Sequence, residues 1–450
     1  MNQHSKMLAT EKIWKLLLKL SAPAMLGMVV NSLYNLVDTI FVGQFIGKMA
    51  IAGLTIVFPI QLLVMAVAQT IGIGGASMIS RSLGAGDVEK AEKTMGNMMT
   101  LTLVISLAIA LLGTIFIVPI LKLFGASEEV LPYAVEYMRI IIWGTFFFVF
   151  ALTSNNIIRA EGNAKVAMVT MIISAGLNII LDPLFIVVFD WGITGAALAT
   201  VLSQAVTVLY LVHYFLKGKT TVKFKMKNLT FEKEIVKEII AVGSSSFVKQ
   251  ASGSISAIIL NNSLRIYGGD SAIAVYGIIN RLLNFTFMPM LGIVYGFQPI
   301  VGFNYGAKLL DRVRETIKLS IIATTIFSIA GFLLLMIFPR FFFSIFTKDA
   351  SFINDGVASM QMVILALPLI GFQIVGASIF QSFGKARQSL FLNSSRSVLF
   401  LIPLALILPL FFQINGLWMA FPVADLLASI VTFIMVAKEM TYLKQEIALQ

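Results

Sequence analysis

The sequence has no cysteine and few charged residues, and these absences exclude several classes of protein. Without cysteine, disulfide frameworks and thiolate metal sites are ruled out. The only two histidines, His4 and His213, stand alone and offer no metal-ligand cluster. Charged residues make up 12% of the 450 residues, whereas 58% are hydrophobic. No soluble domain of this length has such a composition, so we predict a polytopic membrane protein.

Motifs of nucleotide-driven and hydrolytic proteins are also missing. Gly72-Ile73-Gly74-Gly75 has no preceding strand and no following Lys-Ser/Thr, so close helix packing or a hinge explains it better than phosphate binding. The sequence contains no zinc motif His-Glu-x-x-His and no nucleophile motif Gly-x-Ser-x-Gly. We therefore expect neither an enzyme nor a cofactor. If the chain pumps a substrate, an ion gradient must supply the energy.

Twelve hydrophobic runs are long enough to cross a membrane. They lie at about 15–44, 50–80, 94–120, 131–158, 166–189, 193–216, 237–264, 271–300, 315–339, 354–383, 390–412 and 416–437. The net charge of +11 does not indicate a nucleic-acid partner, because the basic residues lie between these runs, facing anionic lipid. The N-terminus and alternate loops hold 25 of the 33 Lys and Arg residues, counting Arg396, against 5 in the opposite loops. We expect a cell-membrane protein with both termini in the cytoplasm.

An internal repeat divides the chain into two halves. Three pairs of loop segments match at one constant offset along the chain: 83–85 with 305–307, 162–165 with 384–387, and 51–52 with 273–274. We predict an all-α membrane protein with an N-terminal lobe (1–216), a cytoplasmic linker (217–236) and a C-terminal lobe (237–450). Six spans is an even number, so the lobes form a parallel repeat. Transporters of this kind place the substrate path between the halves.

The stretch 174–189 is apolar but contains a carboxylate, Asp182. An ionised group in hydrocarbon costs about 2.5–3.5 kcal/mol on insertion scales, so it is rarely found there without a function. Asn178 lies four residues earlier on the same helical face, and Pro183 leaves the carbonyl of Ile179 without its helical partner. These hard oxygen ligands suit a proton or a small cation. The alternative is that Asp182 is a satisfied polar anchor for helix packing.

Polar residues on three other spans reach the depth of Asp182. From the predicted span ends, Asp38, Tyr137 and Thr200 each lie six or seven residues from the outer surface, or roughly 10 Å at 1.5 Å per residue. Two carboxylates in one pocket repel each other, and a proton or Na⁺ relieves that repulsion. Asp38 alone could instead be a cap at the membrane boundary. Pro23 lies deeper in the same span, where it either permits a functional bend or is an ordinary membrane-helix proline.

The second half has no matching acid, because Leu260 stands where the repeat would place the counterpart of Asp38. It contains instead Lys249, Arg281 and Asp425, each within or near the end of a span. We expect Asp425 to pair with Lys249 or Arg281 in a structural ion pair.

Several segments together resemble the multidrug and toxic compound extrusion (MATE) family. They are Pro23 with Asn31-x-x-Tyr34-x-x-x-Asp38-x-x-x-x-Gly43, Arg159-Ala-Glu161-Gly162, and Gln298-Pro299 followed by Asn304-Tyr305-Gly306-Ala307. The last segment is most similar to the MepA-like branch. The loop Arg81–Lys90 does not fit the pattern of the major facilitator superfamily, whose twelve spans are arranged similarly.

The resemblance implies a V-shaped pair of six-helix lobes that export amphipathic, often cationic drugs by H⁺ or Na⁺ antiport. It assigns the ion site to Asp38, Asn178, Asp182 and Thr200, with Tyr137 as a supporting hydroxyl. It places Asn31, Tyr34 and Asn155 toward the drug cavity. The Glu that some relatives carry on the seventh helix is missing here, where Lys249-Gln250 occupies that span. A cation site in the second lobe is therefore not expected.

Two other functions remain as alternatives. A flippase for a lipid-linked precursor would be expected to line its cavity with Arg, whereas the candidate residues of the first half are acidic or neutral. An intramembrane enzyme or an assembly scaffold would not account for the repeat. We expect a monomer that interacts with membrane lipid and small amphipathic substrates.

Overall fold

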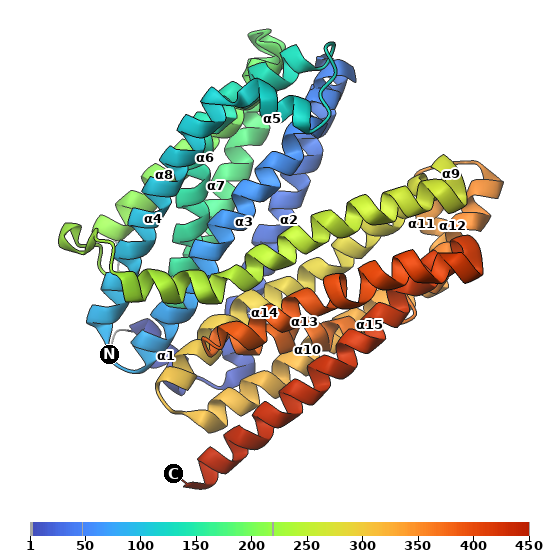
Figure 1. The fold of residues 1–450 in the computed structure, drawn as a ribbon. Coiled ribbons are helices and arrows are strands. Elements are labelled where there is room, and N and C mark those ends of the chain that lie inside the picture. The colour runs from blue at the N-terminus through green and yellow to red at the C-terminus, as the bar shows by residue number, and fades with distance from the viewer. Residues whose placement is uncertain (1–2, 47, 218–219, 450) are drawn as a thin grey trace.

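The computed structural model describes residues 3–46, 48–217 and 220–449, apart from the side chains of residues 3, 35–40, 43 and 48. Among these residues every regular element is a helix and no β-strand occurs. Figure 1 shows two helical bundles arranged as a V. The bundles meet at the end that holds both chain termini and diverge toward the opposite end. The fold is therefore the predicted all-α arrangement of two lobes.

The first lobe consists of six long helices and two shorter elements. The long helices are α2 (Ile13–Phe45), α3 (Lys48–Gly84), α4 (Val88–Ile115), α6 (Leu131–Ala160), α7 (Ala164–Pro183) and α8 (Gly192–Lys217). Between them lie α5 (Ile117–Leu123) and a π-helical turn, η1 (Leu184–Val188), and a short helix α1 (Gln3–Thr10) precedes the lobe. Side chains start two of these helices: Asp87 accepts from the N–H of Lys90 at 2.9 Å, and Asn163 accepts from that of Val166 at 3.4 Å.

The second lobe follows a linker that contains one 3₁₀ turn, η2 (Met226–Asn228). Its helices are α9 (Lys233–Gly306), α10 (Leu310–Ile337), α11 (Pro339–Ser344), α12 (Ala350–Val363), α13 (Leu367–Ser382), α14 (Ala386–Ser394) and α15 (Ile402–Leu449), with a π-helical segment η3 (Ser395–Leu401) before α15. Non-helical backbone at Gly269 divides α9, and at Gln413 it divides α15. Each of these two elements therefore contains two successive helices that fold back on each other (Figure 1).

The described helices account for the predicted number of spans. Nine of them are long and apolar enough to cross a membrane, and the pair α12 and α13, bent by 48°, counts as one more. When α9 and α15 are each divided at their break, the described chain accommodates the twelve spans that the sequence predicts. The chain is therefore a multi-pass membrane protein.

The internal repeat is visible in the backbone of the turns. Gly86 and Lys308, which are related by the repeat offset, both have positive φ, at 79° and 57°. Gly162 and Gly384 are related in the same way, with φ of 87° and 74°. Left-handed backbone is uncommon for residues other than glycine, so its occurrence at matching turns indicates that the two halves turn in the same way. The boundaries of the lobes and linker stay a prediction.

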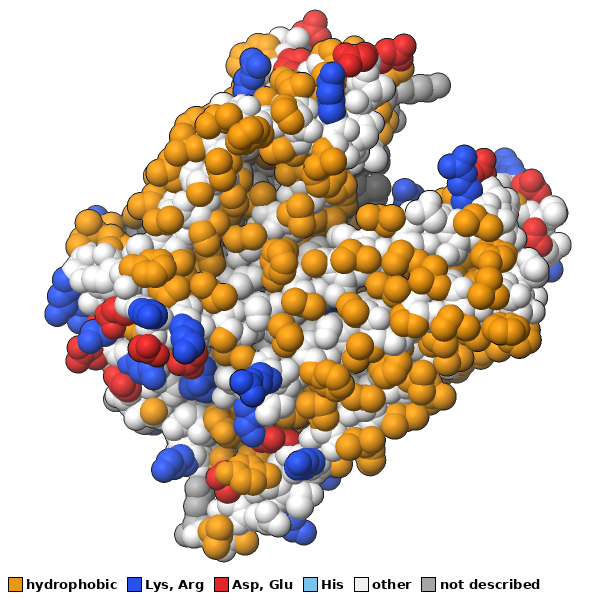
Figure 2. Space-filling model, in the orientation of Figure 1, with side chains coloured by type: hydrophobic (Ala, Val, Ile, Leu, Met, Phe, Trp, Pro, Cys, Tyr) orange, Lys and Arg blue, Asp and Glu red, His pale blue; other side chains and the backbone are white. Residues whose placement is uncertain are grey.

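Packing differs between the two ends of the V. One large core cluster joins both lobes where they meet and includes Leu8, Ile79, Phe297 and Phe380. Toward the open end each lobe has its own cluster, around Ile142 in the first and around Trp418 in the second. On the face shown in Figure 2, hydrophobic side chains cover the arms, and charged ones gather at their tips and near the junction.

Candidate functional site

Three of the predicted ion-site residues lie together where α7 packs against α8. Asn178 and Asp182 come from α7 and Thr200 from α8, and all three are buried. With its amide nitrogen toward Asp182, Asn178 donates to Oδ2 at 2.8 Å and its oxygen accepts from the Thr200 backbone N–H at 3.2 Å. The reverse orientation, with Nδ2 at 3.3 Å from Thr200 Oγ1, satisfies fewer groups. Carboxylate, amide and hydroxyl thus form one continuous polar set inside the lobe.

Small residues on α8 allow this close approach. An added Cβ at Gly195 would lie 2.9 Å from the backbone carbonyl atoms of Phe185, so only glycine lets α8 pack directly on the start of η1. One turn later, Thr200 donates to the carbonyl of Ala196 at 3.1 Å, which orients its hydroxyl oxygen. The hydroxyl oxygen keeps acceptor capacity for a cation or a proton donor.

The backbone changes its helical pattern directly after Asp182. Pro183 is the last residue of α7, and the next five residues form the π-helical turn η1. Proline has no N–H to continue the α-helical hydrogen bonds, and single π-turns often occur at functional sites. The prediction of an irregular helix beside the carboxylate is consistent with this geometry.

Tyr137 lies in the same lobe, and the Asp38 backbone lies in α2. The Tyr137 side chain is buried in the core cluster that also contains Ile186, Ala196 and Ala197, adjacent to the turn that holds Thr200. The side chain of Asp38 lies outside the described part of the structure. Its meeting with Asp182 therefore stays a prediction.

The predicted substrate residues occupy two different environments. Asn31 is exposed and Tyr34 half-buried on α2, a helix that packs against both α7 and α9. Asn155 on α6 is buried, and its Oδ1 accepts from Thr170 Oγ1 at 2.8 Å. Asn155 thus links α6 to α7 in this conformation, and its contact with substrate stays a prediction. Pro23 lies inside α2, where the helix continues through it.

In the second lobe, Asp425 has a partner that differs from the predicted ones. Arg396, in the π-helical segment η3, forms an ion pair with Asp425 of α15 through Nε, and its Nη2 lies 3.3 Å from Oδ2. The prediction of Lys249 or Arg281 as the partner was wrong. The sequence count placed Arg396 with the cytoplasmic loops, whereas η3 lies inside the helical stretch Ala386–Leu449, which is apolar enough to cross a membrane. That position inside an apolar run was the signal that could have identified Arg396.

A second basic residue of the same lobe is Lys249. Lys249 is about halfway along the first part of α9 and lies within electrostatic reach of Arg396. Among the described residues, neither Lys249 nor Arg281 is within ion-pair distance of a carboxylate. The backbone carbonyl of Asp425 also accepts from Gln373 Nε2 at 2.8 Å, which fixes α15 against α13. In the second lobe, therefore, the Asp425 carboxylate is already paired with Arg396, and Lys249 and Arg281 add further positive charge.

The closed end of the V is sealed by glycines that bring α3 and α9 into backbone contact. An added Cβ at Gly74 would lie 2.0 Å from the carbonyl oxygen of Ile239, and one at Gly243 would lie 1.9 Å from that of Thr70. The interpretation of the Gly72–Gly75 stretch as a site of close helix packing is thereby supported. Nearby, Arg81 of α3 pairs with Glu238 of α9 at 2.7 Å.

Comparisons with known proteins agree with this geometry. The family model MatE matches residues 23–184 and again 246–407, so it covers both halves. The chain is 26% identical to the multidrug export protein MepA of Staphylococcus haemolyticus (strain JCSC1435) over 413 residues, covering 92% of this chain and 91% of that protein. MepA of Staphylococcus aureus (strain MRSA252) is 25% identical over 424 residues, covering 94% and 93%.

Solved structures of transporters share the fold over its whole length. A MATE protein in the bent conformation superposes with a TM-score of 0.94 at 29% identity, covering 100% of both chains. An outward-facing MATE multidrug resistance transporter gives a TM-score of 0.93 at 29% identity, covering 99% of this chain and 100% of the other. A MOP superfamily transporter from Pyrococcus furiosus Vc1 gives 0.92 at 29% identity, covering 99% of each. This chain belongs to the MATE family of membrane transporters.

Proposed function

We propose that the chain is an antiporter that uses an inward gradient of H⁺ or Na⁺ to export amphipathic, often cationic drugs and toxic compounds. The polar set of Asn178, Asp182 and Thr200 carries this proposal. It joins a carboxylate to neutral oxygens inside the lobe, which is the ligand chemistry of a proton or a small hard cation. The MepA relatives are named multidrug export proteins, which supports the substrate class.

The direction of transport follows from the proposed orientation. The excess of Lys and Arg beside the N-terminus and in alternate loops favours cytoplasmic termini in the cell membrane. The lobes diverge at the end away from the termini (Figure 1), and the hollow between the arms in Figure 2 would therefore open to the outside. The similarity to an outward-facing relative supports that assignment.

Alternating access requires that the ion bind one conformation better than the other. The proposed ion ligands come from α7 and α8, and Asp38 would add a second carboxylate from α2. Because α2 packs against both α7 and α9, a change of its shape near Pro23 would be felt by both lobes. Ion binding from the outside then favours drug release there, with Asn31 and Tyr34 on the α2 surface as proposed drug contacts. We expect the protein to act as a monomer in lipid.

Drug efflux from everted membrane vesicles tests the proposal, with a Na⁺ gradient and a pH gradient imposed separately. We expect efflux to follow one gradient and to fall at least tenfold in Asp182→Asn and Asp38→Asn at equal membrane abundance. Asp190→Asn is the matched control, because Asp190 is an exposed acid of the same lobe whose φ of 53° suits asparagine.

Normal efflux in both Asp182→Asn and Asp38→Asn would mean that the polar set is structural. The flippase alternative is not favoured by the relatives. Transport of a lipid-linked precursor by reconstituted protein that does not transport drugs would restore it.

A further inference from the structure

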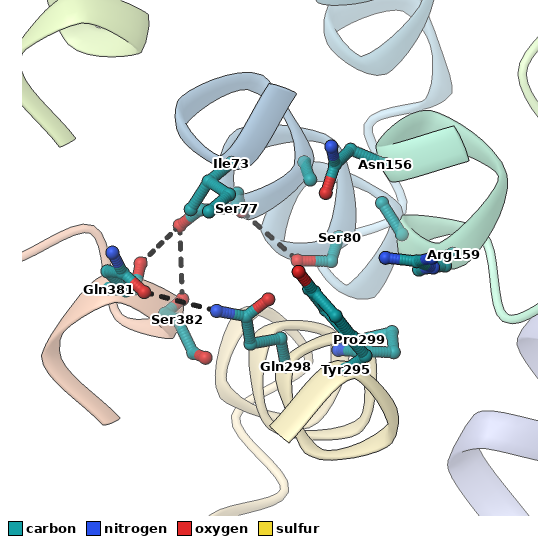
Figure 3. Close-up of a pocket in the computed structure, with 12 residues that line it drawn as sticks. Ile73, Ser77, Ser80, Asn156, Arg159, Tyr295, Gln298, Pro299, Gln381 and Ser382 are labelled. Carbon is teal, nitrogen blue, oxygen red and sulfur yellow. Dashed lines mark hydrogen bonds between the residues drawn. The ribbon is translucent and has the colours of Figure 1, made fainter. Parts of the chain in front are cut away.

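A small cavity lies between the two lobes near the closed end of the V. It is lined by α3 and α6 from the first lobe and by α9 and α13 from the second, as Figure 3 shows. The space available to the centres of water-sized guests is about 20 Å³. A single water needs about 10–15 Å³ by the same measure, so the cavity accepts one small guest and no drug molecule.

The cavity contains one full positive charge, on Arg159 of α6. The Nε of Arg159 is buried without a hydrogen-bond partner, and Nη2 faces the sulfur of Met171 at 3.5 Å. The guanidinium carbon lies 4.2 Å from the centre of the Tyr295 ring. Within the described part of the chain, no carboxylate is within ion-pair distance of this guanidinium.

The other polar groups of the cavity are neutral and mostly bonded to one another. Ser77 Oγ donates to the Gln381 carbonyl at 2.5 Å, and Ser80 Oγ donates to the Ser77 carbonyl at 3.1 Å. Gln298 Nε2 donates to Gln381 Oε1 at 3.1 Å (Figure 3). An amide nitrogen has two protons, so Gln298 keeps one for a guest. These groups orient the lining but do not neutralise Arg159.

A part-buried guanidinium whose Nε is buried and whose charge has no counter-ion is costly, because the desolvation of that part is not compensated. The ring of Tyr295 offsets part of that cost through its negative face. We propose that a halide-sized monovalent anion, chloride in the cell, binds in this cavity between Arg159 and the amide of Gln298. The small free volume of the cavity favours a monatomic anion over a polyatomic one.

This anion joins the two lobes. Arg159 belongs to the first lobe, whereas Tyr295 and Gln298 belong to α9 in the second. An anion held by both stabilises the conformation in which the lobes meet at this end, and separation of the lobes breaks the site and releases it. Chloride therefore favours the conformation described here, whichever cation drives transport.

Thermal unfolding of the purified full-length protein in lipid nanodiscs tests the proposal. Chloride is replaced stepwise by gluconate at constant sodium concentration, pH and ionic strength. We expect the Tm to rise with chloride and to saturate, as binding to one site requires. Bromide should replace chloride, and sulfate should not. A Tm that is equal in chloride and gluconate overturns the proposal.

Two arginines of α6 provide the variant and its matched control. Arg159→Gln removes the charge from the cavity and should abolish the chloride-dependent rise. Arg139→Gln removes an exposed charge from the same helix and should leave the rise unchanged. A rise that persists in Arg159→Gln places the anion elsewhere and overturns the proposal.

Two further measurements do not depend on whether Arg159→Gln folds. Gln298→Met should raise the chloride concentration needed for half-saturation several-fold, because it removes the proposed amide donor. A crystal grown in bromide should show an anomalous peak beside the Arg159 guanidinium. An unchanged half-saturation, or a site without anomalous signal, is the contrary result.

Discussion

The fifth and sixth spans of the two halves have equivalent places in the repeat but different chemistry. In the first half, Asp182 lies with the neutral groups of Asn178 and Thr200 between α7 and α8. In the second half, Asp425 of α15 is held by the guanidinium of Arg396 in η3. Both carboxylates are buried inside their lobes. The first is set among groups that suit an exchangeable cation, whereas the second already has a permanent one.

This difference shows that the two halves share their helices but not the residues of the candidate site. The repeat offset places Leu404 opposite Asp182 and Pro422 opposite Thr200, so the repeat copies the helices and not the site. A permanent ion pair has a structural role, because separating the arginine from the aspartate would leave a buried charge without a partner. A carboxylate among amide and hydroxyl oxygens can gain and lose its cation, as coupling requires. Under the proposed function, we therefore assign the ion-coupled step to the first lobe.

Breaking the permanent pair should have the largest effect on stability. Arg396→Met leaves the nearly inaccessible Asp425 carboxylate, 3% exposed, without its counter-charge. Loss of one partner of a buried pair costs about 3–5 kcal/mol, and we expect the lower end because Arg396 is one-third exposed. The measurement is the Tm of the purified protein.

The double variant Arg396→Met/Asp425→Leu is the control for this prediction. It removes both charges, so its Tm should recover most of the loss. If the double variant is as unstable as the two single losses combined, the pair is not what holds these helices together.

The glycines at the closed end of the V test a feature that the two lobes share, since each lobe contributes one glycine that contacts the backbone of the other. Gly74→Val and Gly243→Val each push a side chain into the backbone of the other lobe. Overpacking of this kind costs about 1–3 kcal/mol, so both variants should separate the lobes at the closed end to a similar extent. Spin-label distances between the lobes report the change. Gly176→Val, where an added Cβ has open space, should leave those distances unaltered.

A smaller effect is expected at the turns of matching position, Glu161 and Phe383. The Glu161 carboxylate accepts from the hydroxyls of Tyr214 and Thr220, both at 2.9 Å, and from the N–H of Thr221 at 2.7 Å, which holds the start of the linker. Glu161→Gln offers a donor where an acceptor is needed, and we expect a loss of about 1–2 kcal/mol.

The readout for Glu161→Gln is faster proteolysis in the linker. Its counterpart Phe383 stacks on the ring of Tyr305, with 4.2 Å between the ring centroids, and has no polar side-chain group that could bond the linker. Phe383→Leu should therefore leave linker cleavage at the wild-type rate. Equal acceleration in both variants would show that the linker responds to general loosening and not to Glu161.

Much of the fold could be predicted from the sequence because its signals are long or periodic. Apolar runs of membrane length predicted the spans, and the loop repeat predicted two similarly turning halves. The predicted loops at 265–270 and 413–415 are also present, as positive-φ residues at Gly269 (67°) and Gln413 (53°). What could not be predicted is how short these turns are, since the helical backbone continues on both sides of each one.

The site was predictable where its residues share one helix. Asn178 and Asp182 were grouped by their spacing of four residues on one helix. Thr200 was grouped with them by its predicted depth below the outer membrane surface. The partner of Asp425 did not follow, because Arg396 lies 29 residues away in a neighbouring segment and several cations competed for that role. The Arg159 cavity was missed for a related reason, since its lining comes from four helices of both halves.

The smallest stability effect is expected at Asp182, and it sharpens the comparison most. Asp182→Asn keeps the side-chain volume and one oxygen that can accept from Asn178. In the absence of the coupling ion, its free energy of unfolding should therefore differ from that of wild type by less than about 1 kcal/mol, which a small shift of the Tm would report. Wild type should gain stability as the coupling ion, H⁺ or Na⁺, is added, and Asp182→Asn should not. An ion-dependent Tm that survives Asp182→Asn would instead place the exchangeable cation outside this set, and the two carboxylates would then both be structural.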